Sequence, residues 1–233
     1  MAKAGPHGAD GNGGMDTRCP ATRQGRLIFL LSPASCGGRR AHILLRDGAK
    51  NDLALRLRTV RGVPLGETFT FLSGLYFRGK LVYARAFARP PAGTPGALVI
   101  TTSRGLVAAD THVTIDDLHE FAGVDIATDN PVYREPLEQT VEELAAALRP
   151  RDRVVLLGSI ATGKYADVLS AILGARLRFP EAFVGRGDMS RGGLMLRCAE
   201  DGEELEYVPL AGAVRHGPRP PKLAPKSRAA QRA

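Results

Sequence analysis

Short apolar runs alternate along this chain with amphipathic segments, and the alternation predicts strands that are joined by helices. Buried strands are indicated by runs that are short and almost continuously apolar, at 26–31, 98–102 and 153–157. Helices are predicted where apolar positions recur at helical spacing, over 75–88, 136–148 and 162–173. The alternating run at 204–209 predicts an edge strand.

This order of elements predicts an α/β fold. Strands that alternate with helices favour parallel pairing, and strands without internal alternation favour helices on both faces of the sheet. We therefore expect a three-layer domain with a mainly parallel central sheet over residues 26–214. Ligands of such sheets bind outside the carboxyl ends of the strands. The loops at those ends, 32–38, 103–110 and 158–164, are expected to converge on one crevice.

The positive charge of the chain is located at its two ends. The net charge of the 233 residues is +8, yet residues 27–214 hold 22 basic and 22 acidic side chains. We expect residues 1–25 to be a disordered N-terminal segment and residues 215–233 to be a disordered, basic, Pro-rich tail. The balanced central part gives no bulk-charge argument for nucleic-acid binding. The tail suits either a solubilising end or non-specific contact with phosphates.

Composition also bears on location. No apolar run approaches the roughly 18 residues that a bilayer crossing needs, so we expect no membrane partner. The three cysteines, Cys19, Cys36 and Cys198, form neither a metal-binding pattern nor an even disulfide set. A cytoplasmic protein is expected.

Residues 154–165 differ by one residue from a phosphate-binding P-loop. Gly158, Gly163 and Lys164 have the required spacing between an apolar strand and a helix, but Tyr165 replaces the hydroxyl residue that holds Mg²⁺. A helix N-terminus favours anions even without the full motif. The segment therefore predicts either an anion site or a turn chosen for packing, and an NTPase or kinase is the least favoured interpretation.

A second unusual segment, 183–193, contains four glycines and two arginines. Arg186 and Arg191 flank Asp188, and guanidinium groups recognise carboxylates and phosphates in a bidentate manner. Asp188 is the candidate catalytic base, with a pKa that its cationic neighbours would lower. The alternative is a self-contained loop in which Asp188 holds an arginine in place.

Three further clusters carry candidate chemistry. Hydroxyl residues and glycines follow the first strand at 32–38, where Cys36 has no assignable His partner and is not favoured as a nucleophile. Tyr76 and Tyr83 share one helical face near Arg78 and Lys80, an arrangement that suits either base stacking or core packing. His112 and His119 bracket two aspartates, but their spacing matches no metal site.

The segments 75–84 and 99–107, together with Asp110, Gly158, Tyr165 and the glycine-rich segment, resemble a group of uncharacterised bacterial α/β domains. Members of that group are similar to the peroxide-stress, DNA-associated YaaA-like proteins. The resemblance covers most of 27–197 and implies a link to DNA or nucleotide metabolism. The chain departs from the pattern of that group at 32–36, because it carries arginines where the group is expected to have a lysine. A more distant likeness to the fold of uracil-DNA glycosylases brings no motif that transfers to this chain.

These observations lead to one function expectation and one alternative. We expect a nucleic-acid or nucleotide-processing enzyme that acts on a base or glycosidic bond, without cofactor or metal; the alternative is a non-catalytic module that binds DNA or a phosphorylated ligand. The oligomeric state is left open. The candidate substrate-binding residues, beside the catalytic candidate Asp188, are Ser32, Ser35, Tyr76, Arg78, Arg104, Gly158, Ser159, Thr162, Lys164, Arg186 and Arg191.

Overall fold

The computed structural model describes residue 1 and residues 25–161, 163–215, 217–221 and 223. The predicted terminal segments 1–25 and 215–233 therefore lie mostly outside the described residues. The strands are β1 (Leu27–Leu31), β2 (Val63–Pro64), β3 (Ala97–Ile100), β4 (Leu106–Ala108), β5 (His112–Val113), β6 (Arg153–Leu157), β7 (Leu177–Pro180) and β8 (Tyr207–Pro209). The α-helices are α1 (Arg39–Leu45), α2 (Asp52–Leu57), α3 (Leu65–Ser73), α4 (Leu75–Phe87), α5 (Ile115–Ala122), α6 (Pro131–Ala147), α7 (Gly163–Leu173) and α8 (Asp188–Asp201), with short 3-10 turns at Gly174–Arg176 and Glu181–Phe183.

Six strands form one sheet in the order β4-β3-β1-β6-β7-β8. The four inner strands run parallel, and the two edge strands β4 and β8 run antiparallel to their neighbours. Strand β1 lies between β3 and β6, pairs with β6 over all five of its residues, and is buried throughout. The predicted α/β fold with a mainly parallel sheet is therefore confirmed, as is the edge strand predicted over 204–209.

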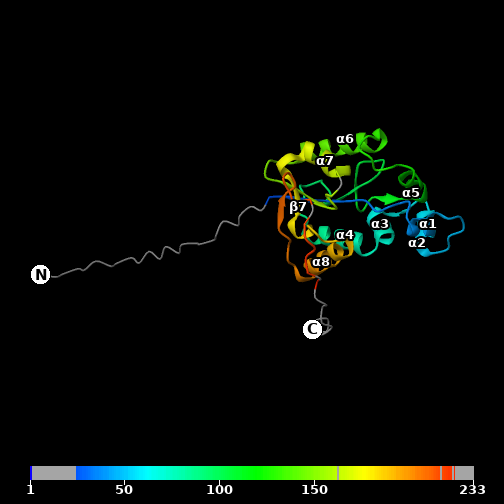
Figure 1. Ribbon diagram of the computed structural model, residues 1–233, viewed down its shortest axis with the longest axis horizontal. Helices are drawn as coiled ribbons and strands as arrows, with labels where there is room; N and C mark the ends of the chain where they lie inside the picture. Colours follow the sequence, from blue (N-terminus) through cyan, green and yellow to red (C-terminus); the bar gives the residue numbers. More distant parts are fainter. Residues whose placement is uncertain (2–24, 162, 216, 222, 224–233) are drawn as a thin grey trace, which may run out of the picture.

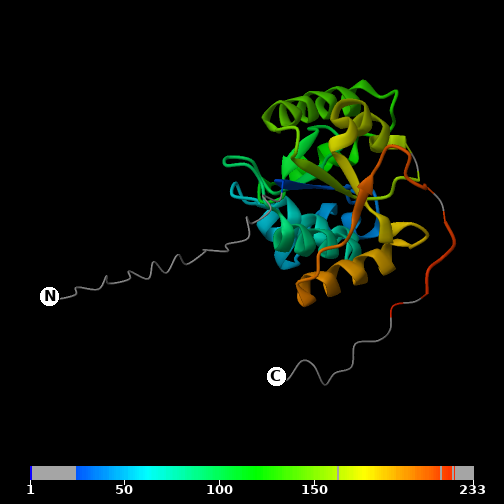
Figure 2. The same ribbon diagram turned by 90° about the vertical axis from the view of Figure 1, so that its left-hand side faces the viewer.

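Helices lie against the sheet on either side. Figures 1 and 2 show α6 and α7 on one side, and α4 and α8 on the other. The apolar stripes of these helices explain the placement, because Phe77, Leu81 and Ala84 of α4 and Leu137, Val141 and Leu144 of α6 are all buried. The helices thus cover the faces of the sheet and leave its carboxyl edge to the loops after β1, β3 and β6.

Two predicted boundaries were wrong. Helix α6 begins at Pro131, because the side chain of Asn130 accepts a hydrogen bond from the N–H of Val132 at 3.1 Å and Pro131 suits the first turn; Pro136 lies inside the helix. The loop expected over 103–110 is a hairpin that contains β4. Its turn depends on Gly105, which has φ of +60° and lies so close to α6 that a Cβ atom would be 2.1 Å from the carbonyl oxygen of Pro136.

The glycine-rich segment 183–193 is not a loop as expected, since α8 begins within it at Asp188. Gly192 faces α4, where an added Cβ would lie 2.7 Å from the carbonyl oxygen of Leu75. Gly79 of α4 faces back, with its own Cβ position 2.6 Å from the carbonyl oxygen of Gly192. The two glycines therefore let the helix backbones touch, which brings the N-terminal end of α8 against Tyr76 and Lys80.

Replacing Gly192 with Ala should destabilise the chain by about 1–3 kcal/mol, because the methyl group would press on the backbone of α4. Gly193→Ala is the matched control, since its Cβ position meets only the side chain of Leu223 at 3.6 Å, an ordinary contact. In a helix, that control should be neutral or stabilising by up to about 1 kcal/mol. Urea unfolding of both variants measures the difference, and equal effects would contradict the close approach of the helices.

Candidate functional site at the carboxyl edge of the sheet

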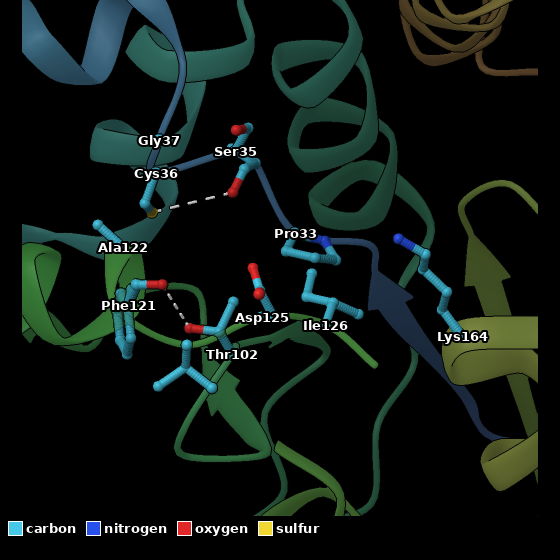
Figure 3. A pocket seen from close by; sticks show the side chains of 12 residues that line it. Pro33, Ser35, Cys36, Gly37, Thr102, Phe121, Ala122, Asp125, Ile126 and Lys164 are labelled. Atoms are coloured by element: carbon cyan, nitrogen blue, oxygen red, sulfur yellow. Dashed lines mark hydrogen bonds between the residues drawn. The ribbon is translucent and has the colours of Figure 1, made fainter. Parts of the chain in front are cut away.

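A cavity of about 390 Å³ opens where the sequence predicts a crevice. Its walls come from the loop after β1, the end of β3, the end of α5 and the start of α7 (Figure 3). Lys164 extends from α7 toward Pro33, and Asp125 brings a carboxylate to the same cavity. Of the three loops expected to converge, 32–38 and 158–164 contribute lining residues, whereas 103–110 contributes none. Thr102, which precedes that loop, lines the cavity, and its hydroxyl donates to the carbonyl oxygen of Phe121 at 2.9 Å. The cavity thus has one positive group, one negative group and an aromatic wall.

Cys36 lines this cavity but is not a reactive thiol. Its side chain is buried and lies 3.9 Å from the carbonyl oxygen of Ala34, and burial raises the pKa of the thiol to about 12. Since the thiolate is the nucleophilic form, Cys36 serves as a small apolar part of the wall.

The charge-bearing group most deeply buried at this edge is Lys80 on α4. Only 1% of the residue is exposed. Its ammonium nitrogen donates to the carbonyl oxygen of Ser32 at 2.7 Å and lies 2.9 Å from the hydroxyl oxygen of the same residue. Ser32 is the first residue after β1, so the contact joins the middle of α4 to the carboxyl end of the central strand.

The surroundings of Lys80 favour an uncharged amine. A protonated Lys carries three donors, and the described residues offer its nitrogen two oxygen partners, both on Ser32. Burial lowers the pKa of Lys80 to about 7, with Asp188 raising it and Arg191 lowering it further. The rings of Tyr76 and Phe77, 4.4 and 4.8 Å from the nitrogen, favour the charged form but do not outweigh the loss of hydration.

The P-loop-like segment closes the other side of Ser32. Gly158 follows β6, and a Cβ there would lie 2.8 Å from the Cβ of Ser32 and 3.1 Å from the phenol oxygen of Tyr165. That phenol accepts a hydrogen bond from the N–H of Ser159 at 3.2 Å and also hydrogen-bonds with Ser32. Burial raises the pKa of Tyr165, and these hydrogen bonds partly offset the effect. The turn after β6 therefore packs around the phenol of Tyr165.

The same segment differs from a P-loop in how its amides are used. The N–H of Ser159 points at Tyr165, and the N–H of Ala161 lies 3.4 Å from the hydroxyl of Ser159. Both donors thus have protein partners. Thr162, predicted to bind substrate, lies outside the described residues.

Helix α8 adds Asp188 and Arg191 to this cluster, next to Tyr76 of α4. The hydroxyl of Tyr76 is buried without a hydrogen-bond partner among the described residues, and burial raises its pKa while the nearby guanidinium of Arg191 lowers it. Arg191 is anchored by the carbonyl oxygen of Phe183 at 3.0 and 3.2 Å. Asp188 lies 3.9 Å from Arg191 and its side chain is 66% exposed. A buried, unpartnered phenol beside a guanidinium is a place where a ligand oxygen would be stabilised.

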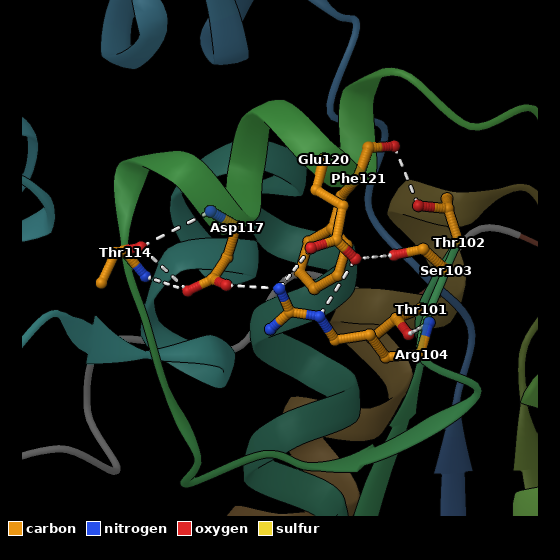
Figure 4. A network of polar contacts seen from close by, with 8 residues as sticks. All are labelled: Thr101, Thr102, Ser103, Arg104, Thr114, Asp117, Glu120 and Phe121. Carbon is orange, nitrogen blue, oxygen red and sulfur yellow. Dashed lines mark hydrogen bonds and ion pairs between the residues drawn. The ribbon is translucent and has the colours of Figure 1, made fainter.

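Three predicted arginines lie away from this cluster. Arg104 is held by Asp117 at 2.5 Å and by Glu120, and stacks 5.4 Å from the ring of Phe121 (Figure 4). Arg186 donates to the carbonyl oxygen of Ala182 at 2.9 Å. Arg78 is exposed on α4. The donors of Arg104 and Arg186 are thus directed at the protein's own oxygens, and a ligand would have to compete for them.

Asp117, between His112 and His119, has a local role. Asp117 forms a capping box with Thr114 at the start of α5, and the pKa of its carboxyl is lowered by hydrogen bonds from Thr114 and Arg104 that outweigh the opposing effect of burial. Across the described ranges, no group of three or more His, Cys, Asp or Glu side chains is placed to hold a metal ion.

The structure therefore sorts the predicted residues into groups. Around Lys80 it gathers Ser32, Tyr76, Gly158, Ser159, Asp188 and Arg191, whereas Ser35 and Lys164 line the adjoining cavity. The two sites are linked because Ser32 precedes Pro33 and Lys164 precedes Tyr165. Lys80 and Tyr165 were missing from the predicted site. The available signal was that Lys80 falls on the apolar stripe of its helix, three residues after Phe77.

Comparisons with family models, with curated proteins and with solved structures find no match for this chain. In the part of the chain that the structure describes, no helix has the length and apolar character needed to span a bilayer.

The pH dependence of stability should reveal the buried amine. The pKa of Lys80 falls from about 10.5 in the unfolded chain to about 7 in the fold. Between these pH values the unfolded state binds more protons than the folded state. The free energy of unfolding therefore rises with pH, by up to about 1.4 kcal/mol per pH unit. Lys80→Met removes this slope, so its gain over the wild type should be largest below about pH 7 and shrink toward pH 10. Denaturant unfolding at five pH values measures this difference, and the exposed Lys50→Met is the control. Parallel pH profiles for the wild type and Lys80→Met would show that Lys80 is charged in the fold.

Proposed function

We propose that this chain is an enzyme of nucleotide or nucleic-acid processing that acts on a base or glycosidic bond, with its reaction centre at Lys80 and its ligand held in the adjoining cavity. The observation that carries the proposal is a buried lysine whose hydrogen-bond partner among the described residues is Ser32, next to an open cavity at the carboxyl ends of parallel strands. An uncharged amine near neutral pH is suited to accept a proton from a reacting group.

The lining of the cavity supports a nucleotide as ligand. Lys164 offers a positive charge to a phosphate, and Asp125 offers acceptors to the amino group of a base. Phe121 and Ile126 supply apolar surface to the same cavity. The resemblance to YaaA-like proteins supports the same substrate class. Alongside this assignment we propose a cytoplasmic location, a three-layer α/β core and terminal segments that add positive charge.

A non-catalytic module is the second candidate, and one observation favours it. Lys80 is almost completely buried and is not among the residues that line the cavity. In this alternative, Lys80 holds the loop after β1 in shape, and the cavity binds a phosphorylated ligand or DNA without reaction. A P-loop NTPase is the least supported function, because the phenol of Tyr165 occupies the position of the metal-holding hydroxyl and faces Ser32 and Ser159.

Two variants separate the candidates. Lys164→Ala should weaken the binding of a nucleoside monophosphate by about 3–10-fold, since it removes one partly screened charge, whereas Lys50→Ala should leave binding unchanged. Lys80→Met should lower base release from nucleosides or oligonucleotides by roughly 10²–10⁴-fold with binding kept within a few-fold. Calorimetry and base-release assays on the same preparations measure both effects.

Binding that depends on Lys164 without turnover in the wild type would favour the module. Unchanged affinity in Lys164→Ala would show that the cavity is not the binding site of the nucleotide.

A further inference from the structure

We propose that Ser32 is a nucleophile and that Lys80 is its base, which gives this chain an acyl-transfer activity on ester or amide substrates. This inference goes beyond the proposed function and does not depend on a nucleotide ligand. The nitrogen of Lys80 and the hydroxyl oxygen of Ser32 are 2.9 Å apart, within the range at which a base takes the proton of a nucleophile. Ser–Lys pairs are one of the arrangements that perform this chemistry.

The hydroxyl of Ser32 lies between a phenol and an amine. The phenol oxygen of Tyr165 accepts a hydrogen bond from the N–H of Ser159 at 3.2 Å and also hydrogen-bonds with Ser32, in the sense that lowers the pKa of the phenol. The amine of Lys80 donates to the carbonyl oxygen of Ser32 at 2.7 Å, which fixes its orientation, and its nitrogen lies 2.9 Å from the hydroxyl oxygen of the same residue. When this amine is uncharged, its lone pair is within reach of the hydroxyl proton of Ser32.

An activated nucleophile also needs a base that is held in place, and here two aromatic rings hold the amine. The amine is held over the rings of Tyr76 and Phe77, at 4.4 and 4.8 Å. Beside it, the hydroxyl of Tyr76 is buried and has no partner among the described residues. This hydroxyl, with Arg191 nearby, is the group available to donate to the oxyanion that forms at a substrate carbonyl.

The oxygen of Ser32 forms a bond to the carbonyl carbon while its proton moves to Lys80, and the carbon-to-leaving-group bond breaks as Lys80 returns that proton to the leaving group. Water then attacks the carbonyl carbon of the acyl-serine while Lys80 takes one of its protons. The bond between that carbon and the oxygen of Ser32 breaks, and Lys80 returns the proton to this oxygen, which leaves a carboxylic acid and free Ser32. No electron transfer or further reactant is needed.

The charged and titratable groups that face Lys80 come from three helices. They are Tyr76 on its own helix, Asp188 and Arg191 on α8, and Tyr165 on α7 through Ser32. Asp188 and Arg191 act on the amine in opposite directions, so burial decides its state. The reaction should therefore increase with pH over the range in which this amine loses its proton, centred near pH 7.

A fluorophosphonate probe tests the proposal on the full chain. We expect one adduct, located by peptide mass on Ser32, with a labelling rate that rises about tenfold from pH 6 to pH 8. Ser32→Ala should abolish the adduct, and Lys80→Met and Lys80→Arg should slow labelling at least 100-fold. Ser73→Ala and Lys50→Met, whose side chains lie elsewhere, should label as the wild type does.

Tyr165→Phe removes only a hydroxyl and should slow labelling about tenfold. If the Lys80 variants fail to fold, this variant and the pH profile of the wild type still test the proposal. An adduct elsewhere, no adduct on the folded wild type, or equal rates in Lys80→Arg and wild type would overturn the proposal. Nucleoside monophosphate binding, measured separately, decides the proposed function independently of this result.

Discussion

The contact on which the rest of the site depends is the one between the amine of Lys80 and Ser32. It places a lysine inside the protein, 1% exposed, at the point where the central strand β1 ends. Burying an amine costs free energy, and the two hydrogen bonds to Ser32 offset only part of that cost. The remaining free-energy cost of burial is reduced when the amine gives up its proton. The position of α4 therefore sets both the shape of the loop after β1 and the charge of the group beside it.

Two close approaches of the backbone make this arrangement possible. Gly79 and Gly192 let α4 and α8 touch, which brings Arg191 and Asp188 to the side of Tyr76. Gly158 leaves space for Ser32 and Tyr165 to meet across the end of the sheet. In each case a side chain at the glycine would collide with backbone or with a member of the cluster. Within the P-loop-like segment and the glycine-rich segment, packing at these contacts explains Gly158 and Gly192.

Much of the fold follows from apolar patterning, and much of the site does not. The parallel strands β1, β3 and β6 and the helices α4, α6 and α7 were predicted, because continuous apolar runs and helical spacing are local signals. The parallel strand β7 and the helices α1, α2, α3 and α5 were not predicted. The helical start at Asp188 was missed since glycines at 192 and 193 argue against a helix until the partner helix is known. Tyr76 and Tyr83 share a face as predicted, but Tyr83 packs 5.6 Å from Phe29, and its hydroxyl bonds to that of Tyr207 at 2.6 Å. Lys80 was outside the predicted site because its burial depends on three separate segments.

The most direct test of this account is the pKa of Lys80 measured in the folded chain by NMR, from the pH titration of the ¹³Cε and ¹⁵Nζ shifts, assigned with Lys80→Arg. We predict a midpoint near 7, against the ordinary value of about 10.4 for a lysine in water. A midpoint that stays above about 10 would contradict the account, because Lys80 would then be a permanent cation and unable to act as a base at neutral pH.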